Sequence, residues 1–511
     1  MKGQLAWTRK DILVVSLMFA LTVGIRLYFA LQVPYVIGSE SFYWQRQVDS
    51  ILESGTPLHN DLLFSGGRTF EGSPLFAYLL AIPSYFLGFE FGSKILLNIA
   101  SSLLTILAFL ICKKTTSSKY VAYLTSFFAG FIPVIWERTV HTVTIYAITI
   151  PLLVWCINCF LDITHAKKYR VWWYALSLLF FSILHSSVLI LIAGLLVYLV
   201  MLKVESLEVS KSELEIIVFS TLVAFIVQMT LYRQVLFAHG IGVIWQNIPD
   251  QIVGKYFAET TLLEAFYRIG EIPVFFGMII IAKYLFRQKD KIVYLFISFA
   301  LAVGVALYLR LLEPWVGMMV LGAILVLLFS FYYTFYLDYV PSTKFARFLP
   351  VLKVLFFVTF ILTSALPALD LVVGGIEEAA MDRRLPALQW LKAHTQTHDI
   401  ILAPISDAAM IASLADRVIV ADTSFLMVHD AKQRQDAIDL AFTSPYESFA
   451  VEAMEELGVR YVYVNRPALA RQYGVETLPF ISPEGKSDCF SRVYEGGVEI
   501  FRRTCEVRLI S

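Results

Sequence analysis

Residues 12–33 read ILVVSLMFALTVGIRLYFALQV, a predominantly apolar run that is long enough to cross a lipid bilayer as one helix. Lys2, Arg9 and Lys10 precede the run, and Pro34 follows it. A cleaved signal peptide has a shorter apolar region and a small-residue cleavage site, so we interpret the run as a retained first span. The basic residues before it predict a cytoplasmic N-terminus.

The whole chain continues this apolar character. It has 511 residues, 58% hydrophobic and 15% aromatic, with no net charge, and its mean hydropathy is +0.69. A soluble core could not bury so much apolar surface. Apolar runs recur throughout residues 1–373, whereas 374–511 have ordinary mixed polarity. We predict a polytopic α-helical membrane domain followed by a soluble domain. Zero net charge gives no field for nucleic acid, so membrane lipids and not nucleic acid are expected around it.

About eleven segments have the length and apolarity of membrane spans. They are 11–33, 93–112, 120–136, 140–162, 171–185, 187–202, 214–232, 268–286, 292–309, 314–336 and 349–372. This assignment concentrates lysine and arginine in the short loops on the inner side, as the positive-inside rule requires. An odd number of spans places residues 374–511 outside the cell. We therefore predict a multi-pass protein of the cell membrane with an extracytoplasmic C-terminal domain.

Leu75–Phe91 is also apolar, but counting it as a span would invert every later loop. Pro83 and Gly88 interrupt it. We expect a bent or re-entrant helix along the outer membrane interface here, within a long first outer loop over residues 34–92.

The C-terminal segment shows alternating helix and strand patterns that predict a small α/β domain. Helices are expected at Met381–His394 and Phe449–Leu457, and strands at Ile400–Ala403, Val418–Ala421 and Tyr461–Val464. Its two cysteines, Cys489 and Cys505, would form a disulfide in an oxidising compartment or stay as two free thiols. Both alternatives remain open at this stage.

Glu40 is the first candidate for chemistry, within Gly38-Ser39-Glu40-Ser41 directly after the first span. A carboxylate at the membrane surface could deprotonate an acceptor hydroxyl or amide, or bind a divalent ion that neutralises a phosphate leaving group. A solvated loop acid is the alternative interpretation.

The second outer hairpin adds Glu137, Arg138 and His141. Arg138 could bind phosphate, and His141 could donate a hydrogen bond or bind metal, with Glu137 as a further metal or acceptor contact. Anchoring at the membrane interface would also account for these residues.

Arg310 lies where an apolar span reaches the outer surface, three residues before Glu313. A guanidinium suits a lipid phosphate, whereas an ion pair with Glu313 is the structural alternative. The long outer loop over 233–268 resembles a mobile lid and contains Glu259, a candidate contact for metal or acceptor.

These features together resemble the GT-C membrane glycosyltransferases, and within them the catalytic subunit of oligosaccharyltransferase and its single-subunit bacterial and archaeal relatives. Glu40 and Arg46 repeat the acid and arginine that begin the first outer loop in that family. Gly66-Gly67-Arg68 and Gly72-Ser73-Pro74 resemble its glycine-rich segment, and Arg138 and Arg310 resemble its hairpin and phosphate-binding arginines. The resemblance implies a GT-C fold and a donor sugar carried on a polyprenyl lipid.

Two departures from the family pattern stand out. Acids that complete a metal site in the family correspond to Ile145 and Ala147 here, so Mg or Mn is expected only as an uncertain cofactor. The family's WWDYG sequence, which recognises the Ser or Thr of an asparagine glycosylation site, is replaced by the region 404–408. Transfer of an oligosaccharide to Asn-X-Ser/Thr therefore does not follow from the resemblance.

The sequence thus predicts an inverting membrane glycosyltransferase that moves a sugar from a polyprenyl-phosphate or pyrophosphate carrier to a protein, lipid or glycan acceptor at the outer face. A diverged oligosaccharyltransferase is a variant of this prediction. Glu40 is expected to act as the general base or as the acid that positions the acceptor. Arg310 and Arg138 are expected to bind the donor phosphate, and all three are expected to meet at one groove. The alternatives are a catalytically inactive GT-C-like scaffold subunit and a lipid or glycan transporter.

Overall fold

The computed structural model describes residues 8–70, 72–164, 170–239, 261–379, 381–423, 428, 430–481 and 487–505. Two compact units share the chain. The helical unit comprises Met1–Tyr35, Glu90–Leu231 and Phe257–Gly375, and the sheet unit comprises Val36–Phe89, Tyr232–Tyr256 and Ile376–Ser511. The predicted division at residue 373 stays a prediction, but most of the first outer loop groups with the C-terminal residues.

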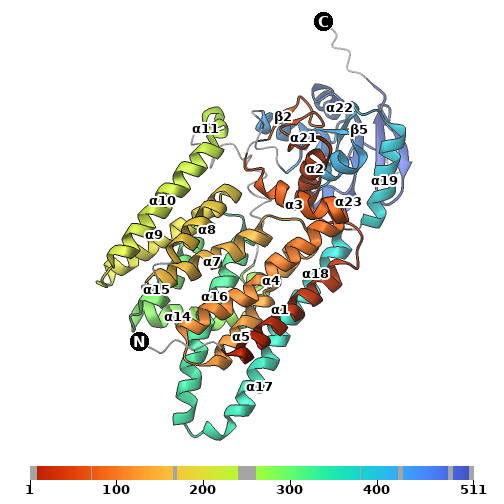
Figure 1. The fold of residues 1–511 in the computed structure, drawn as a ribbon. Coiled ribbons are helices and arrows are strands. Elements are labelled where there is room, and N and C mark those ends of the chain that lie inside the picture. Colours follow the sequence, from red (N-terminus) through yellow and green to blue (C-terminus); the bar gives the residue numbers. More distant parts are fainter. Residues whose placement is uncertain are drawn as a thin grey trace. The chain divides into compact units, whose positions relative to one another are not determined.

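The helical unit is a bundle of long apolar helices (Figure 1). They are α1 (Arg9–Ala30), α4 (Phe89–Thr115), α5 (Lys119–Gly130), α6 (Pro133–Thr139), α7 (Tyr146–Thr164), α8 (Arg170–Leu184), α9 (Val188–Val204), α10 (Lys211–Leu231), α13 (Leu262–Ile269), α14 (Glu271–Phe286), α15 (Lys291–Tyr308), α16 (Pro314–Tyr339), α17 (Leu349–Phe360) and α18 (Leu366–Ala379). Short helical turns join some of them: η2 (Val340–Ser342), η3 (Ala346–Phe348) and the π-helical η4 (Ile361–Ala365). Helix α15 packs against both α9 and α16, and α16 packs against α14. The buried faces of these helices are aliphatic and aromatic, and together they form part of the core.

Every predicted span coincides with a helix. Eight are long and apolar enough to cross a membrane among the residues that the structure describes, and a ninth is the pair α13 and α14, bent by 104° at Gly270. The two remaining predicted spans are the shorter apolar helices α8 and α9. The polytopic fold is therefore confirmed, although the segment predicted as 140–162 becomes helical only from Tyr146.

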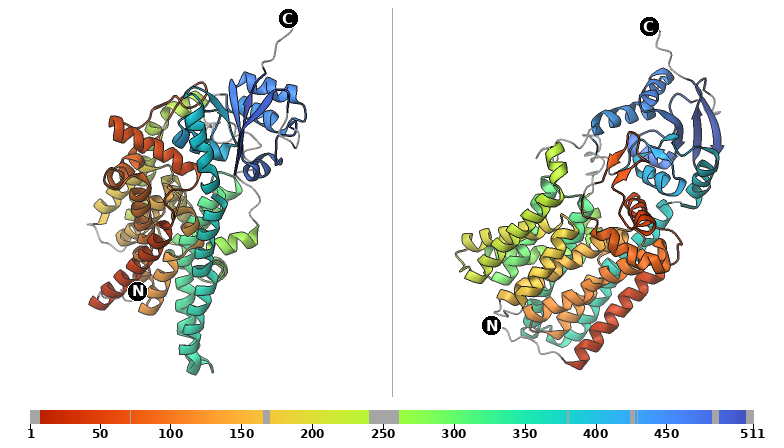
Figure 2. Two further views of the ribbon diagram at one scale, coloured as in Figure 1. Left: turned by 90° about the vertical axis from the view of Figure 1, so that its right-hand side faces the viewer. Right: turned by 45° about the horizontal axis from the view of Figure 1, so that its top comes forward.

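The sheet unit contains α2 (Ser39–Ser54), β1 (Asn60–Asp61), β2 (Arg68–Thr69), α3 (Leu75–Leu87), α11 (Arg233–His239), α19 (Met381–His394), β3 (Ile400–Leu402), α20 (Ile405–Met410), η5 (Ile411–Ala415), β4 (Val418–Ile419), α21 (Ala431–Thr443), α22 (Glu447–Glu456), β5 (Val459–Val464), α23 (Arg466–Tyr473), β6 (Phe490–Glu495) and β7 (Glu499–Arg503). Its five strands lie in the order β4-β3-β5-β7-β6, with helices packed around them (Figure 2). The first three are parallel, and β7 and β6 form an antiparallel hairpin. This confirms the predicted α/β domain.

A segment of the first loop extends this sheet. The amide of Ser65 donates to the Ile419 carbonyl, and the amide of Ile419 donates to the Leu63 carbonyl, each over 2.9 Å. Phe64 therefore lies beside β4 as a parallel bridge. The first loop is thus built into the sheet.

The apolar segment 75–91 is divided at Gly88, where φ is +77°. Helix α3 before it has 13 residues and contains Pro83, and at 1.5 Å per residue it is about 20 Å long, too short to cross a bilayer. Residues 89–91 instead begin α4. Phe76 of α3 packs edge-on against Trp44 of α2, with ring centres 4.7 Å apart. Its predicted position at the membrane interface stays a prediction.

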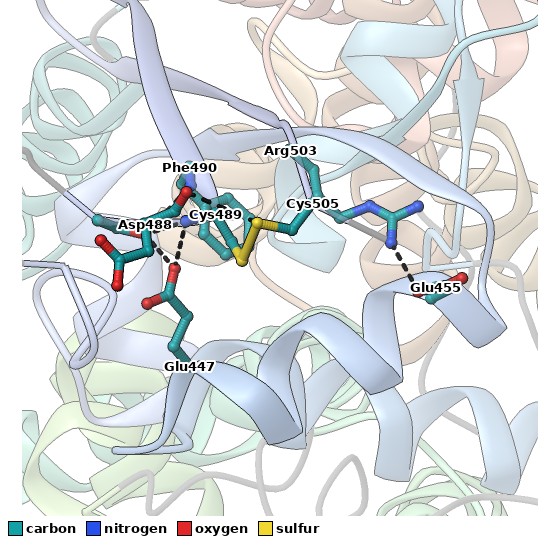
Figure 3. Close-up of a disulfide and its surroundings, with 8 residues drawn as sticks. Glu447, Glu455, Asp488, Cys489, Phe490, Arg503 and Cys505 are labelled. Carbon is teal, nitrogen blue, oxygen red and sulfur yellow. Dashed lines mark hydrogen bonds and ion pairs between the residues drawn. A yellow bond between two sulfur atoms is a disulfide. The ribbon is translucent and has the colours of Figure 1, made fainter. Parts of the chain in front are cut away.

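Cys489 and Cys505 form a disulfide that joins the start of β6 to the end of β7 (Figure 3). Glu447 of α22 accepts a hydrogen bond from the Cys489 amide at 2.8 Å. The structure therefore selects the disulfide over the free thiols, whereas Cys112, Cys156 and Cys159 are buried and free.

Candidate functional site

Helix α6 carries the first group of predicted site residues. It begins with Pro133, which is suited to a first helical turn because it has no amide hydrogen to leave unbonded. The indole of Trp136 donates to the Gly130 carbonyl at 2.7 Å, which fixes the helix against the end of α5. Glu137 and Arg138 follow on the next turn.

Glu137 and Arg138 belong to a chain of ion pairs. Arg268 of α13 binds Glu137 at 3.0 Å and Glu264 at 2.9 Å. Arg138 lies 3.6 Å from Glu137, and 41% of its side chain is exposed. Because Glu137 is bound more closely by Arg268, the Arg138 guanidinium keeps donors for a further partner.

The Arg138 guanidinium also lies over the indole of Trp315, 5.5 Å from the ring centre. Trp315 is the second residue of α16, and Glu313 precedes that helix. Burial raises the pKa of Glu313, while a hydrogen bond from Trp315 and the charge of Arg138 oppose the rise. Burial thus disfavours the ionised form of Glu313 relative to a solvent-exposed acid.

Arg310 is exposed and lies in the turn between α15 and α16. Its φ is +55°, a left-handed conformation that glycine normally adopts at the end of a helix. The turn is closed by amides of Arg310 and Leu311, which donate to the carbonyls of Leu307 at 3.0 Å and Ala306 at 2.8 Å. An arginine here costs about 1 kcal/mol relative to glycine, which suggests a function for its side chain.

His141 lies in the connection between α6 and α7, with 4% of its surface exposed. Neither ring nitrogen has a hydrogen-bond partner among the residues described. Burial, together with the charges of Lys94 and Arg26, lowers the pKa of His141 to about 4. The ring is therefore neutral at physiological pH.

Glu40 lies in the sheet unit, in the first turn of α2. Its side chain is half-buried, and its carboxylate accepts a hydrogen bond from the Trp44 indole at 3.2 Å. The hydroxyl of Thr423 donates to the hydroxyl of the neighbouring Ser39 at 3.4 Å. The structure thus fixes the direction of Glu40, whereas Glu259 lies outside the described residues.

Arg138 lies over Trp315 at the start of α16, and the turn that bears Arg310 comes directly before that helix in the chain. Glu40 belongs to the other unit, so its predicted meeting with the two arginines stays a prediction.

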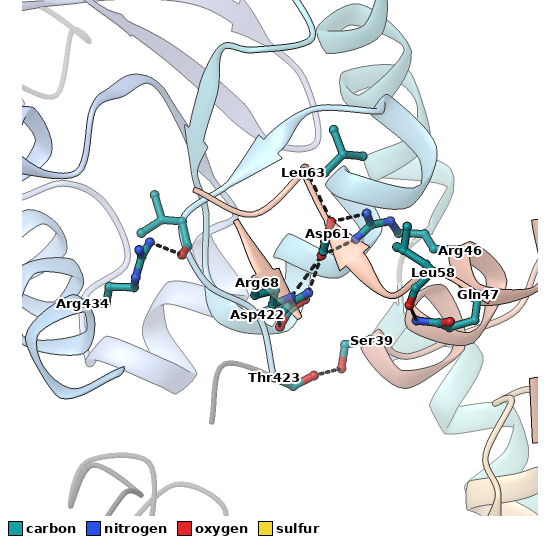
Figure 4. A network of polar contacts seen from close by, with 11 residues as sticks. Ser39, Arg46, Gln47, Leu58, Asp61, Leu63, Arg68, Asp422, Thr423 and Arg434 are labelled. Carbon is teal, nitrogen blue, oxygen red and sulfur yellow. Dashed lines mark hydrogen bonds and ion pairs between the residues drawn. The ribbon is translucent and has the colours of Figure 1, made fainter. Parts of the chain in front are cut away.

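A buried ionic network in the sheet unit was not predicted from the sequence (Figure 4). Arg68 binds both oxygens of Asp422 at 2.6 Å and one oxygen of Asp61 at 3.0 Å. Arg46 binds the same Asp61, so this family-like arginine has a structural partner. Burial opposes ionisation of Asp61, but hydrogen bonds and charge from Arg46 and Arg68 bring the pKa of Asp61 below its usual value.

A cavity of about 430 Å³ lies beside this network. It is lined by Asn60, Asp61, Leu62, Gly67, Arg68, Thr69 and Val428. The Gly66-Gly67-Arg68 stretch was the sequence signal for this region, but nothing in the sequence connects Asp61 with the distant Asp422.

A metal site does not fit the residues that the structure describes. No three His, Cys, Asp or Glu side chains among them are grouped so that they could hold an ion. Ile145 and Ala147 are 3% and 1% exposed and fill core positions where the resemblance places acids. We therefore derive no chemical step through a metal.

The region 404–408 begins helix α20. Asp407 is 1% exposed, lies 3.4 Å from Arg384 and accepts a hydrogen bond from Asn465. Its carboxylate is thus bound within the sheet unit.

Comparisons with known proteins agree on the fold. No family model matches the sequence, and no curated protein sequence matches it. The oligosaccharyltransferase of Archaeoglobus fulgidus in its apo form is 13% identical, with a TM-score of 0.67 over 94% of this chain and 74% of that one. ArnT from Cupriavidus metallidurans bound to undecaprenyl phosphate is 11% identical, with a TM-score of 0.57 over 97% and 98%.

The arabinofuranosyltransferase AftD from Mycobacteria is 12% identical, with a TM-score of 0.52 over 99% of this chain and 40% of that one. Other structures of the archaeal enzyme contain dolichol-phosphate with an inhibitory peptide, or Zn with sulfate. All three proteins are GT-C glycosyltransferases, so the GT-C fold implied by the sequence resemblance is confirmed.

Proposed function

We propose that this protein is a membrane glycosyltransferase that transfers a sugar from a polyprenyl-phosphate or pyrophosphate carrier to a protein, lipid or glycan acceptor at the outer membrane face. The main support is the position of two arginines at the start of α16. Arg138 lies over Trp315, and Arg310 is held in the left-handed turn just before that helix. The start of a long helix also favours an anion, because its free amides and macrodipole are positive.

In the proposed reaction, an acceptor heteroatom attacks the anomeric carbon as the bond from that carbon to the phosphate oxygen breaks, which inverts the configuration. Glu40 takes the proton of the acceptor, and the lipid phosphate leaves with the bonding electron pair. Arg138 and Arg310 offset the charge that grows on the leaving phosphate. The hydrogen bond from Trp44 holds the Glu40 carboxylate in one orientation.

The carrier lipid is proposed by analogy with the compared structures. One of them contains undecaprenyl phosphate and another dolichol-phosphate. A single phosphate carries less charge than a pyrophosphate and depends less on a metal, so we favour a polyprenyl-phosphate monosaccharide as donor. Zn accompanies the archaeal enzyme in one structure. A pyrophosphate donor would depend more on Mg or Mn, for which the described residues of this chain offer no group of three ligands.

The test is transfer from radiolabelled undecaprenyl-phosphate and undecaprenyl-pyrophosphate sugars by the purified full-length protein in nanodiscs. Glu40→Gln is expected to lower kcat by about a hundredfold or more. Glu53→Gln makes the same chemical change at an exposed position of the same helix and should retain full activity. Arg310→Met should chiefly raise KM for the donor. Unchanged turnover in Glu40→Gln would remove this residue from the mechanism.

A second candidate is an inactive GT-C-like subunit that binds the lipid but does not transfer the sugar. The buried Ile145 and Ala147, at positions where the family resemblance expects acids, favour it. Binding of undecaprenyl phosphate without turnover of any donor in the same assay would support this candidate over the enzyme.

A further inference from the structure

Arg26 of α1 is 1% exposed and makes all its side-chain contacts inside the helical unit. Its Nε donates to the Asn98 side chain of α4 at 3.0 Å, and its Nη2 donates to the hydroxyl of Thr139. The guanidinium also lies over the ring of Trp136, 5.0 Å from its centre. Two of these three contacts are with α6, the helix that carries Arg138.

None of these partners carries a negative charge. Among the residues described, no carboxylate lies within ion-pair distance of Arg26. The nearest further charge is also positive: Lys94 lies one helical turn before Asn98 and donates to the carbonyls of Val33 and Tyr35 at 2.7 and 2.6 Å. The buried ring of His141, which both charges influence, is neutral. Glu90, one helical turn from Lys94, is the acid that acts on Lys94.

An uncompensated arginine inside a membrane domain is costly, so such residues usually serve a function. The contacts of Arg26 show what it does locally. It fixes Trp136 and Thr139 on α6, and Asn98, which it also binds, donates to the carbonyl of Val140 at 3.1 Å. Helices α1 and α4 thus hold both the middle and the end of α6, on either side of Arg138.

We propose that Arg26 is a positioning residue for Arg138 and that it orients α6 so that the Arg138 guanidinium binds the phosphate of a polyprenyl-phosphate lipid. This inference rests on the proposed function. In this proposal Arg26 does not touch the lipid and acts on it only through α6. Its planar guanidinium is required because one side chain must reach Asn98, Thr139 and the Trp136 ring together.

The test is the affinity of the purified full-length protein for undecaprenyl phosphate, with undecaprenol as the uncharged probe of the same chain length. We expect Arg26→Met to weaken binding of the phosphate lipid about tenfold and to leave undecaprenol unchanged. Arg26→Lys retains the charge but not the three contacts, so it should bind as weakly as Arg26→Met. Thr139→Val removes one acceptor without changing shape and should weaken binding by a smaller factor.

A double variant separates positioning from general damage. If Arg26 acts through Arg138, then Arg26→Met combined with Arg138→Met should bind no more weakly than Arg138→Met alone. If the double variant instead lost affinity by the product of the two single losses, or if Arg26→Lys kept full affinity, the positioning role would be overturned. The control variant is Glu213→Gln. Glu213 lies on α10, away from α6, and its buried carboxylate binds Lys291 at 2.9 Å, so its removal should leave the affinity for the phosphate lipid unchanged. A matching loss there would overturn the inference as well.

The two proposals fail differently. If the wild-type protein does not prefer undecaprenyl phosphate to undecaprenol, the proposed lipid-phosphate site is wrong. If it does, and Arg26→Met and Thr139→Val bind like wild type, the phosphate site stands and only the role of Arg26 is overturned.

Discussion

Two of the buried arginines, one taken from each unit, are held in opposite ways. Arg68 in the sheet unit and Arg26 in the helical unit are 6% and 1% exposed. Arg68 is bound by the carboxylates of Asp61 and Asp422, whereas Arg26 is bound by a side-chain amide and a hydroxyl. The first charge is neutralised where it lies. The second is kept, and this suggests that the first arginine maintains structure and the second serves the site.

The surroundings of the two residues extend the contrast. In the sheet unit, Arg46 and Arg68 face Asp61 and Asp422, so two positive and two negative groups cancel. Near Arg26, buried Lys94 is influenced by the acid Glu90, whereas Arg26 itself has no carboxylate partner among the residues described. The same substitution at the two arginines should therefore have opposite consequences for stability and for binding.

The largest effect is expected for Arg68→Met. Removing Arg68 leaves Asp422 buried and without its bidentate partner, and breaking a buried pair in this way costs about 3–5 kcal/mol. Pulse proteolysis of the full-length protein in urea would measure the loss in the sheet unit. Adding Asp422→Asn should restore part of the stability, because Asp61 keeps Arg46 as its partner and no buried carboxylate is then left unpaired. A stability equal to wild type in the single variant would contradict a structural role.

Reduction of the disulfide should have the next largest effect. Cys489 and Cys505 are 16 residues apart, and closing a loop of that size stabilises a protein by about 3 kcal/mol. The double variant Cys489→Ser/Cys505→Ser should lower the stability of the sheet unit accordingly. Cys112→Ser, at a free buried cysteine of the helical unit, is the comparison. If reductant were without effect on the wild-type protein, the disulfide would not form in the mature chain.

The sequence predicts the elements of both units well, because their signals are local. Apolar runs gave every span, and alternating patterns gave β3, β4 and β5. The hairpin of β6 and β7 was missed although Gly496-Gly497 marks its turn. Long-range pairing was also beyond the sequence: Phe64 lies beside Ile419, and Arg68 meets Asp422, only because the first loop joins the sheet.

The candidate site shows the same division. Glu137, Arg138 and Arg310 were identified because charges next to apolar spans are conspicuous. Arg26 lies within an apolar run, and the sequence does not show which helix its charge faces. Only the structure places Trp136 and Thr139 beside it. Local composition thus reveals candidate ligands for a phosphate, whereas the residues that position them emerge only from packing.

Acid should weaken the sheet unit through Asp61. Because its partners bring the pKa of Asp61 below the usual value, the unfolded chain binds protons more readily, and the stabilisation is full above the unfolded pKa of about 3.9 and lost as pH falls through the folded pKa. The loss should be smaller than that in Arg68→Met, because Arg68 still binds Asp422. Urea unfolding between pH 6 and acid would show it, and Asp61→Asn should flatten the curve. If the stability of wild type and of Asp61→Asn fell in parallel as the pH was lowered, Asp61 would be excluded as the titrating group.

The smallest effect on stability is expected for Arg26→Met, and it tests the comparison most directly. Arg26 pairs with no carboxylate, so its removal leaves no buried charge, and methionine fills a similar volume; replacing buried charge with apolar side chains is often neutral or stabilising. The Thr139 hydroxyl still donates to the Ile135 carbonyl. Thermal unfolding in detergent should therefore agree with wild type within about 1 kcal/mol, although affinity for the lipid phosphate falls. A loss as large as that of Arg68→Met would mean that both arginines are structural, and the difference between the two regions would then concern only the partners that hold the charge.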